Sequence, residues 1–296
     1  MNLVRRIGFV GLGMMGAPMA ERLSRAGHSL FLSDAAAGRA ASLAGQWGAK
    51  LLDDQTVGDL EILITMLPNS AVVETVLLGE VAGSGWSDRL PRGATVIDMS
   101  SSEPSRSRAL GDALQQRGVK YLDAPVSGGV KRAVDGSLAI LVGGEAEELE
   151  KQRTLLETLG TKVLHIGAAG AGHAAKALNN YVSAAGLVAT VEALRIAERF
   201  GIDPAVMTDV LNASSGRSNT SDNKVKQFML SGTYASGFAL QLMNKDLKIA
   251  RSLAENLGYP MTLGRLCADI WEEAAQRSLP TTDHTEMYLL LAANDA

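Results

Sequence analysis

A glycine-rich turn close to the N-terminus places the strongest constraint on how this chain folds. A short apolar run from Ile7 to Val10 precedes glycines at positions 11, 13 and 16, and the residues from Ala17 to Leu23 have helical periodicity. A strand, a Gly-x-Gly-x-x-Gly turn and a helix in this order are typical of the first βαβ unit of a dinucleotide-binding domain. The sequence therefore predicts an α/β fold that begins with a Rossmann domain.

Each glycine of this turn has a separate physical role. Gly11 permits the tight turn, Gly13 lets the backbone approach a pyrophosphate, and Gly16 lets the helix pack on the strand. The phosphates then meet the free N–H groups and the positive dipole end of the helix. We expect the cofactor to contact Gly11, Leu12, Gly13, Met14, Met15 and Gly16.

An acidic residue follows the second predicted strand. The apolar run from Ser29 to Ser33 ends at Asp34, about twenty residues past the glycine turn. A carboxylate there accepts hydrogen bonds from the ribose hydroxyls and repels a 2′-phosphate, so the sequence favours NAD over NADP. Arg39, a short distance downstream, could soften that preference.

Two further buried strands are predicted, at Glu61–Pro68 and Thr95–Ser102. In an open parallel sheet, ligands bind beyond the carboxyl ends of the strands. We therefore expect Leu67, Pro68, Ser100 and Ser101 to line the cofactor cleft. The serines at 100 to 102 could equally be N-caps of a helix that starts near Pro104.

The periodicity changes near Ile166 and divides the chain. Short strands and helices alternate before this point, whereas the later residues read as helical with turn signals between them. The 296 residues are enough for two domains. We predict an NAD-binding Rossmann domain at 1–166 and an all-α domain at 167–296, joined by a long helix from about Ala169 to Phe200.

Composition argues against several classes of function. A net charge of −4 gives no footprint for nucleic acid, and no apolar run approaches the length of a membrane span. Cys267 is the single cysteine, which excludes an internal disulfide, and we expect it to be a core residue. Met1 lies close to the first predicted strand, so we expect no targeting segment and a cytoplasmic protein. We expect no metal site, because the histidines are scattered, at His28, His165, His173 and His284.

A lysine and an asparagine stand four residues apart in the helical segment from Gly170 to Asn180. This spacing returns Lys176 and Asn180 to the same helical face. A lysine whose pKa is lowered by burial can give and take a proton, and an asparagine can orient a substrate oxygen. Considered alone, the pair could instead be a solvated lysine and a surface amide. His173, one turn before Lys176, has a smaller chance of a site role.

Two other segments carry candidate residues. The run from Asp123 to Gly129 leads a strand into a Ser-Gly-Gly turn, whose hydroxyl and exposed N–H groups suit a carboxylate, although a plain loop is the alternative. Lys245 and Lys248 lie three apart on a predicted helix, where a solvated charged face is the simpler interpretation.

Taken together, the motifs resemble those of the β-hydroxyacid dehydrogenases. The resemblance spans the whole chain and rests on four motifs in order, at Gly11–Gly16, Asp123–Gly129, Gly170–Asn180 and Lys245–Leu247. It implies a Rossmann domain, an all-helical C-terminal domain, and a homodimer or homotetramer.

The resemblance also assigns roles to residues. It implies that Lys176 is catalytic and that the substrate is held by Ser127, Gly128, Gly129 and Asn180. Lys245 would lie on the nicotinamide side of the cleft, supported by Asp246 at the substrate site. Leu67, Pro68 and Ser101 match positions that touch the cofactor.

The expected reaction is reversible hydride transfer between NAD and the CH–OH group of a small 3-hydroxy acid. The candidates are 3-hydroxyisobutyrate, glycerate or tartronate semialdehyde, and threonate. Several relatives carry an aromatic residue where this chain has Asn219, Thr220 and Ser221, so we expect a more polar pocket. Lys131 and Arg132 could meet a second anion, or simply face solvent.

Three alternatives share this fold. An imine reductase usually replaces the lysine at position 176. A 6-phosphogluconate dehydrogenase has a longer C-terminal part, and a histidine where this chain has Asn179. A non-catalytic dinucleotide-sensing protein would have lost the lysine or gained interaction domains. The presence of Lys176 therefore favours the dehydrogenase.

Overall fold

The computed structural model describes residues 4–36, 38–81 and 83–291, and the packing divides the chain into two units, Met1–Lys176 and Ala177–Ala296. The first residues of the long helix, up to Lys176, pack with unit 1. This division lies after residue 166, where the change of periodicity places the domain boundary, and the boundary at 166 stays a prediction.

Unit 1 is built on one sheet of nine strands within its described residues. Its first strand, β1, is the apolar run that leads into the glycine turn, and the predicted strands after Ser29, Glu61 and Thr95 are all present. The strands are β1 (Arg6–Val10), β2 (Ser29–Ser33), β3 (Lys50–Leu51), β4 (Ile62–Thr65), β5 (Thr95–Asp98), β6 (Lys120–Asp123), β7 (Val126–Ser127), β8 (Leu138–Gly144) and β9 (Gly160–Gly167).

The strand order is β3-β2-β1-β4-β5-β6-β8-β7, with β9 also paired to β8. The pairings from β3 to β6 are parallel, whereas β8 runs antiparallel to β6. The order reverses at β1, where the chain goes from β3 on one side to β4 on the other. Ligands of such sheets bind at this switch point, beyond the carboxyl ends of the strands.

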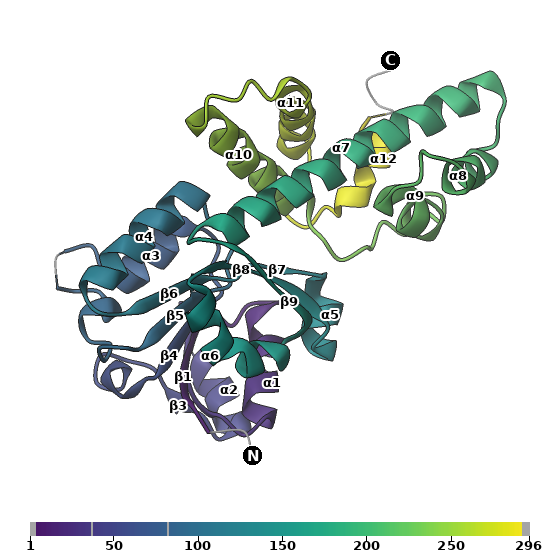
Figure 1. The fold of residues 1–296 in the computed structure, drawn as a ribbon. Helices are drawn as coiled ribbons and strands as arrows, with labels where there is room; N and C mark the ends of the chain where they lie inside the picture. The colour runs from purple at the N-terminus through teal and green to yellow at the C-terminus, as the bar shows by residue number, and fades with distance from the viewer. Residues whose placement is uncertain (1–3, 37, 82, 292–296) are drawn as a thin grey trace. The chain divides into compact units, whose positions relative to one another are not determined.

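Helices cover both faces of the sheet (Figure 1), as the prediction of a Rossmann domain requires. One face buries side chains of α1, α2 and α6, and the other buries side chains of α3 and α4. Each face has its own apolar core, so the sheet is buried on both sides. The helices of unit 1 are α1 (Gly16–Arg25), α2 (Arg39–Trp47), α3 (Ser70–Leu78), α4 (Pro104–Gln116), α5 (Gly129–Asp135) and α6 (Ala146–Glu157), with 3-10 turns at Val57–Asp59 and Trp86–Asp88.

The described part of unit 2 is helical, as predicted. It begins in the 30-residue helix α7 (Ala171–Phe200), and its core packs around the fully buried Trp271. The remaining elements are α8 (Pro204–Ala213), α9 (Asn219–Asn223), a π-helical turn (Val225–Met229), α10 (Leu240–Asn256), α11 (Thr262–Gln276), a 3-10 turn (His284–Glu286) and α12 (Met287–Leu290).

Turn-forming residues end these helices where the sequence predicts breaks. Helix α7 ends before Gly201, and Pro204 occupies the first turn of α8, whose N-cap Asp203 accepts from the N–H groups of Ala205 and Val206. No helix in the described residues is long and apolar enough to cross a membrane.

Candidate active site

The three glycines of the turn after β1 differ in what surrounds them. A Cβ at Gly11 would overlap the Met66 carbonyl, and one at Gly16 would overlap the Gly11 carbonyl. Gly13 differs, because a Cβ there would meet no atom within 4 Å. Two glycines are therefore fixed by the packing of the protein itself, whereas Gly13 leaves open space beside an exposed backbone.

The side chains between these glycines have different environments. Met14 is 76% exposed, whereas Leu12 is fully buried in the core, side chain and backbone alike. Its N–H donates to Asp34 Oδ2 at 2.7 Å, and its carbonyl accepts from Arg39 Nε at 2.5 Å. Asp34 thus lies at the glycine turn, as predicted, and Arg39 is brought to the same place.

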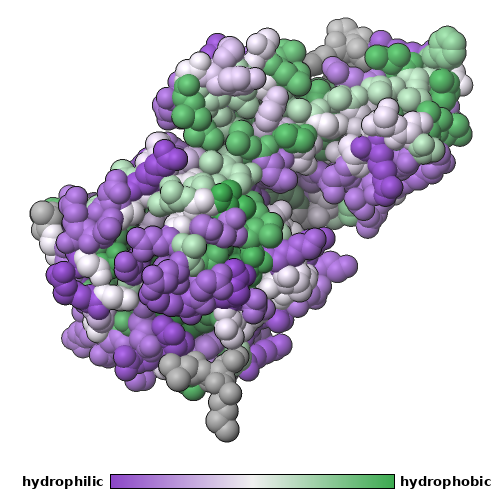
Figure 2. Space-filling view, viewed as in Figure 1, coloured by the Kyte–Doolittle hydropathy of each residue, from purple (hydrophilic) through white to green (hydrophobic). Residues whose placement is uncertain are grey.

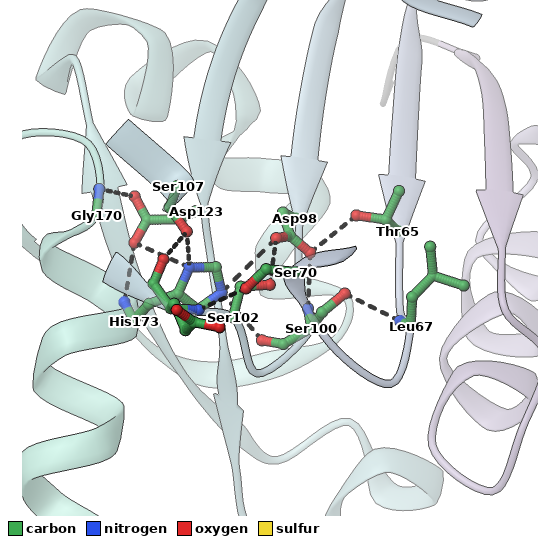
Figure 3. A network of polar contacts seen from close by, with 11 residues as sticks. Thr65, Leu67, Ser70, Asp98, Ser100, Ser102, Ser107, Asp123, Gly170 and His173 are labelled. Carbon is green, nitrogen blue, oxygen red and sulfur yellow. Dashed lines mark hydrogen bonds and ion pairs between the residues drawn. The ribbon is translucent and has the colours of Figure 1, made fainter. Parts of the chain in front are cut away.

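The loops after β4 and β5 are joined by a buried carboxylate that sequence reasoning missed. Asp98, the last residue of β5, accepts from Thr65 Oγ1 at 2.9 Å, from the Ser100 N–H at 3.0 Å and from Ser102 Oγ at 3.0 Å. Ser100 Oγ in turn accepts from the Leu67 N–H at 2.9 Å. Figure 3 shows this chain of contacts at the ends of the two strands.

These contacts decide what the serines do. The N-cap of α4 is Glu103, which makes no side-chain capping bond, so the alternative that Ser100 to Ser102 cap this helix is wrong. Ser100 and Ser102 are buried in the Asp98 network, and only Ser101 is partly exposed. Leu67 and Ser101, which are both partly exposed, and the exposed Pro68 therefore remain the candidates for contact with a cofactor on these loops.

A second buried carboxylate holds the start of α7. Asp123, at the end of β6, accepts from the Gly170 N–H at 2.7 Å and from the His173 N–H at 2.9 Å. The first N–H groups of a helix lack partners within the helix and carry its positive dipole, so a carboxylate is well placed there. Asp123 is fully buried, and it anchors the helix segment that bears Lys176.

His173 lies between the two carboxylates, in the interior of unit 1 (Figure 3). Its Nε2 is 3.1 Å from the Ser100 carbonyl oxygen and its Nδ1 is 2.8 Å from Ser107 Oγ. The buried Tyr121 is part of the same surroundings: burial, followed by the charges of Asp98 and Asp123, raises its pKa well above the usual value. Both ring nitrogens of His173 therefore contact groups of the protein itself.

The Ser-Gly-Gly segment forms a turn from β7 into the short helix α5. Ser127 pairs with Ala139 of β8, and its side chain is partly exposed. Gly128 and Gly129 have φ angles of 135° and 70°, which side chains with a Cβ rarely adopt. Ser127 lies four residues after Asp123 in the chain.

In unit 2, a short hydrogen bond fixes the amide of Asn180. Asn180 is buried, and its Nδ2 donates to Asp246 Oδ2 of α10 at 2.5 Å, while its Oδ1 accepts from Asn179 Nδ2 at 3.1 Å. A carboxylate only accepts hydrogen bonds, so this contact sets which end of the amide is nitrogen. The sequence predicts that Asp246 supports Lys245; the structure shows Asp246 holding Asn180.

The residues with weaker sequence signals, among them His165, Cys267 and Lys248, have other protein groups around them. His165 Nε2 lies 2.9 Å from the Gly144 carbonyl, and Cys267 is buried in the unit 2 core, where burial raises the pKa of its thiol to about 11. Lys248 pairs with Glu272 at 2.6 Å on an exposed face. Of the three residues at the expected aromatic position, Thr220 and Ser221 are buried and only Asn219 is exposed.

No group of histidine, cysteine and carboxylate side chains in the described ranges is placed to hold a metal ion.

Comparison with known proteins identifies the family. Residues 6–167 match the NAD binding domain of 6-phosphogluconate dehydrogenase, and residues 170–291 match the family described as NAD-binding of NADP-dependent 3-hydroxyisobutyrate dehydrogenase. A 3-hydroxyisobutyrate dehydrogenase of Pseudomonas aeruginosa is 37% identical over 91% of this chain and 92% of its own length. The chain belongs to the β-hydroxyacid dehydrogenase family.

Other members of the family are similar over their whole length. A 2-(hydroxymethyl)glutarate dehydrogenase of Eubacterium barkeri is 34% identical over 94% of this chain and 92% of its own. The 3-hydroxyisobutyrate dehydrogenase of Mycobacterium tuberculosis, solved with L-serine, has a TM-score of 0.89 at 33% identity and covers 98% of this chain and 99% of its own. The protein is therefore an NAD-dependent dehydrogenase of 3-hydroxy acids, which confirms the predicted fold, family and enzyme class.

The residues of unit 1 fit this cofactor, and two glycines test the fit. Gly13→Ala adds a methyl group where the protein has open space, so we expect unchanged thermal stability. Overpacking against a bound pyrophosphate costs about 1–3 kcal/mol, or about 5- to 150-fold in the Kd for NAD. Gly16→Ala should instead lower the melting temperature, because its Cβ would overlap the Gly11 carbonyl. Calorimetric titration and thermal unfolding of both variants check this, and a Gly13→Ala protein that binds NAD normally would contradict it.

Asp34 and Arg39 should set the choice between NAD and NADP in opposite directions. Like charges brought together cost several kcal/mol, so removing the carboxylate in Asp34→Ser should lower the preference for NAD about tenfold or more. Arg39→Ala, which removes the guanidinium on the Leu12 carbonyl, should raise it. The ratio of kcat/KM with the two cofactors measures this, and equal ratios in wild type and Asp34→Ser would refute the role of Asp34.

Proposed function

We propose that the protein oxidises the primary alcohol of a 2-substituted 3-hydroxypropanoate, with Lys176 as the general acid and base. Three compounds support this substrate class: 3-hydroxyisobutyrate and 2-(hydroxymethyl)glutarate, named for the two relatives, and the L-serine bound in the solved structure. All three share a CH₂OH group on the carbon that bears the carboxylate. They differ only in the third substituent of that carbon, which is a methyl, an ammonium or a carboxyethyl group.

The observation that carries the proposal is the anchoring of the Lys176 segment on Asp123. The Asp123 carboxylate accepts from the N–H groups of Gly170, just before α7, and of His173, in its first turn, which lie six and three residues before Lys176. The chain then leads from Asp123 within four residues to Ser127 and the glycine turn. The segment of the proposed acid/base lysine is therefore held at a fixed point, as an oriented reaction requires.

Each residue then has a defined task. The hydroxyl of Ser127 and the N–H groups of the Gly128–Gly129 turn receive the substrate carboxylate. The Lys176 amine takes the proton of the substrate hydroxyl as the C–O bond becomes a carbonyl, and Asn180, held by Asp246, orients the same oxygen. NAD, when bound, would supply the acceptor for the hydride of the carbinol carbon, so that one proton and one hydride would leave the alcohol. In the reverse direction, Lys176 returns the proton.

We also propose a site role for Lys245. Its place beside Asp246 on α10 and the family resemblance support a role next to the nicotinamide, where its charge would favour the neutral form of a nearby amine. Met14, Met15, Pro68 and Ser101 complete the proposed cofactor contacts on unit 1.

A substrate panel tests the proposal. Purified protein with NAD is assayed for NADH with 3-hydroxyisobutyrate, L-serine, glycerate and 2-(hydroxymethyl)glutarate, beside threonate, whose C3 alcohol is secondary. 2-Hydroxybutyrate, which lacks a C3 hydroxyl, is the matched control. We expect turnover of at least one of the first four acids and none of 2-hydroxybutyrate. Faster turnover of 2-hydroxybutyrate than of every 3-hydroxy acid would reject the proposed class.

We also infer that the protein is a homo-oligomer. Figure 2 shows hydrophobic surface among the helices of unit 2, and several large apolar side chains there are more than half exposed. They include Val182, Ile196, Phe200, Leu263 and Leu266. Apolar surface of this kind commonly marks a protein contact. Light scattering should give at least twice the 31.1 kDa chain mass, and the mass of a monomer at micromolar concentration would reject the inference.

A further inference from the structure

The side chain of His173 connects three elements of unit 1 that meet at the carboxyl ends of the strands. It lies in the first turn of α7 and is 1% exposed. Its Nε2 faces the Ser100 carbonyl oxygen in the loop after β5, and its Nδ1 faces Ser107 Oγ on α4. A carbonyl oxygen only accepts, so Nε2 carries a hydrogen and donates it to Ser100.

The hydrogen bonds continue from Ser100 to the proposed cofactor loops. Ser100 donates its N–H to Asp98 and accepts from the Leu67 N–H with its hydroxyl. A continuous series of contacts therefore runs from Leu67, beside Pro68, through Ser100 to His173 (Figure 3). His173 stands three residues before Lys176 in the same helix. The series links the loop after β4 to the segment that bears the proposed acid/base.

The His173 ring lies between two buried carboxylates. Asp98 Oδ2 lies 3.9 Å from Nε2 and Asp123 Oδ2 lies 3.7 Å from Nδ1, and both carboxylates are fully buried. Asp98 and Asp123 are thus the titratable groups seen to face the ring, and Tyr121 interacts with both of these carboxylates. In a buried polar network each member fixes the geometry of the others, because an unmet partner is costly away from water. A change at His173 is therefore transmitted to the Ser100 loop and to the start of α7.

We propose that His173 is a positioning residue, which holds the Ser100 loop against the first turn of α7 and so sets the place of Lys176 relative to the cofactor. This proposal rests on the proposed function of Lys176. A misplacement of about 1 Å in a reacting group can cost about 100-fold in rate. The effect of losing the ring should therefore appear mainly in kcat, and less in the KM for the hydroxy acid.

Two substitutions at His173 and a matched pair elsewhere form the test. His173→Gln keeps a donor and an acceptor at the end of the side chain, whereas His173→Leu keeps the bulk and loses both. His165 is the control, because it also donates to a backbone carbonyl in unit 1, but its acceptor is Gly144 at the end of β8. His165→Gln and His165→Leu should leave kcat within about twofold of wild type.

For His173→Leu we expect kcat to fall about 10- to 100-fold, with a larger primary deuterium isotope effect, and His173→Gln to restore most of the rate. Amide hydrogen exchange of the peptide covering residues 168–178 should quicken in the leucine variant and return toward wild type in the glutamine variant. Melting temperatures show how far each variant is destabilised as a whole.

The outcomes separate the positioning role from the proposed function. Wild-type kcat in His173→Leu, or equal losses in both variants with unchanged exchange at 168–178, would overturn the positioning role. If the wild-type protein oxidises no acid of the panel, the proposed function fails on that result alone. The hydrogen-exchange comparison still tests whether His173 holds the start of α7. Faster exchange at 168–178 in the leucine variant with wild-type exchange in the glutamine variant supports this role, and equal exchange in both variants rejects it.

Discussion

Lys176→Met should lower kcat by about 10²- to 10⁴-fold, the loss that follows removal of a general acid/base. Methionine has a similar length and a similar helix propensity, so α7 should remain intact. The Kd for NAD should change little, because the assigned task of Lys176 is on the substrate hydroxyl. Steady-state kinetics and calorimetric titration of NAD measure the two quantities on the same preparation.

Lys151→Met is the matched control for this substitution. Lys151 is also a helical lysine of unit 1, but it lies on α6 with its side chain 54% exposed. It pairs with Glu147 one turn away at 3.0 Å and lies 3.7 Å from the buried Glu148. Exposed pairs of this type contribute about 0.3–0.5 kcal/mol, so activity and folding should both persist. A Lys176→Met protein that retains a third or more of the wild-type kcat would remove Lys176 from the chemistry.

Asp123→Ala should produce the largest loss of stability among the site variants. The substitution leaves the N–H groups of Gly170 and His173 buried without their acceptor. Each unsatisfied buried donor costs about 1–3 kcal/mol, so the free energy of unfolding should fall by about 2–6 kcal/mol. The rate should fall as well, because the same carboxylate holds the start of α7, three residues before Lys176.

Two comparisons sharpen the Asp123 prediction. Asp123→Asn keeps one acceptor oxygen and should lie between the wild type and the alanine variant. Asp112→Ala removes an exposed aspartate from α4 and should be close to neutral. Urea unfolding monitored by circular dichroism measures all three. If Asp123→Ala unfolds at the same urea concentration as Asp112→Ala, the anchoring role is wrong.

Local patterns were sufficient to predict much of this fold. The apolar run before Gly11, the run from Ser29 to Ser33 and the helix from about Ala169 to Phe200 are all recovered, because each is encoded by neighbouring residues. The place of Asp34 was also predictable, since its distance from the glycine turn is fixed by one βαβ unit.

The Asp98 and His173 network could not be predicted in the same way. His173 meets Ser100 across 73 positions of sequence, and Asp98 meets Thr65 across 33, so no local period reports either contact. One signal was present: Asp98 ends a fully buried strand, and a buried carboxylate requires partners. The partner of Asp246 was missed for the same reason, because Asn180 lies 66 positions away.

The most direct test of the central claim is the fate of the hydrogen on the carbinol carbon. The best substrate of the panel, deuterated at C3, is oxidised with NAD, and the NADH is examined by mass spectrometry. Hydride transfer predicts one deuterium in each NADH formed, and a rate that collapses in Lys176→Met. NADH without deuterium, or deuterium lost to water, would contradict the proposed reaction.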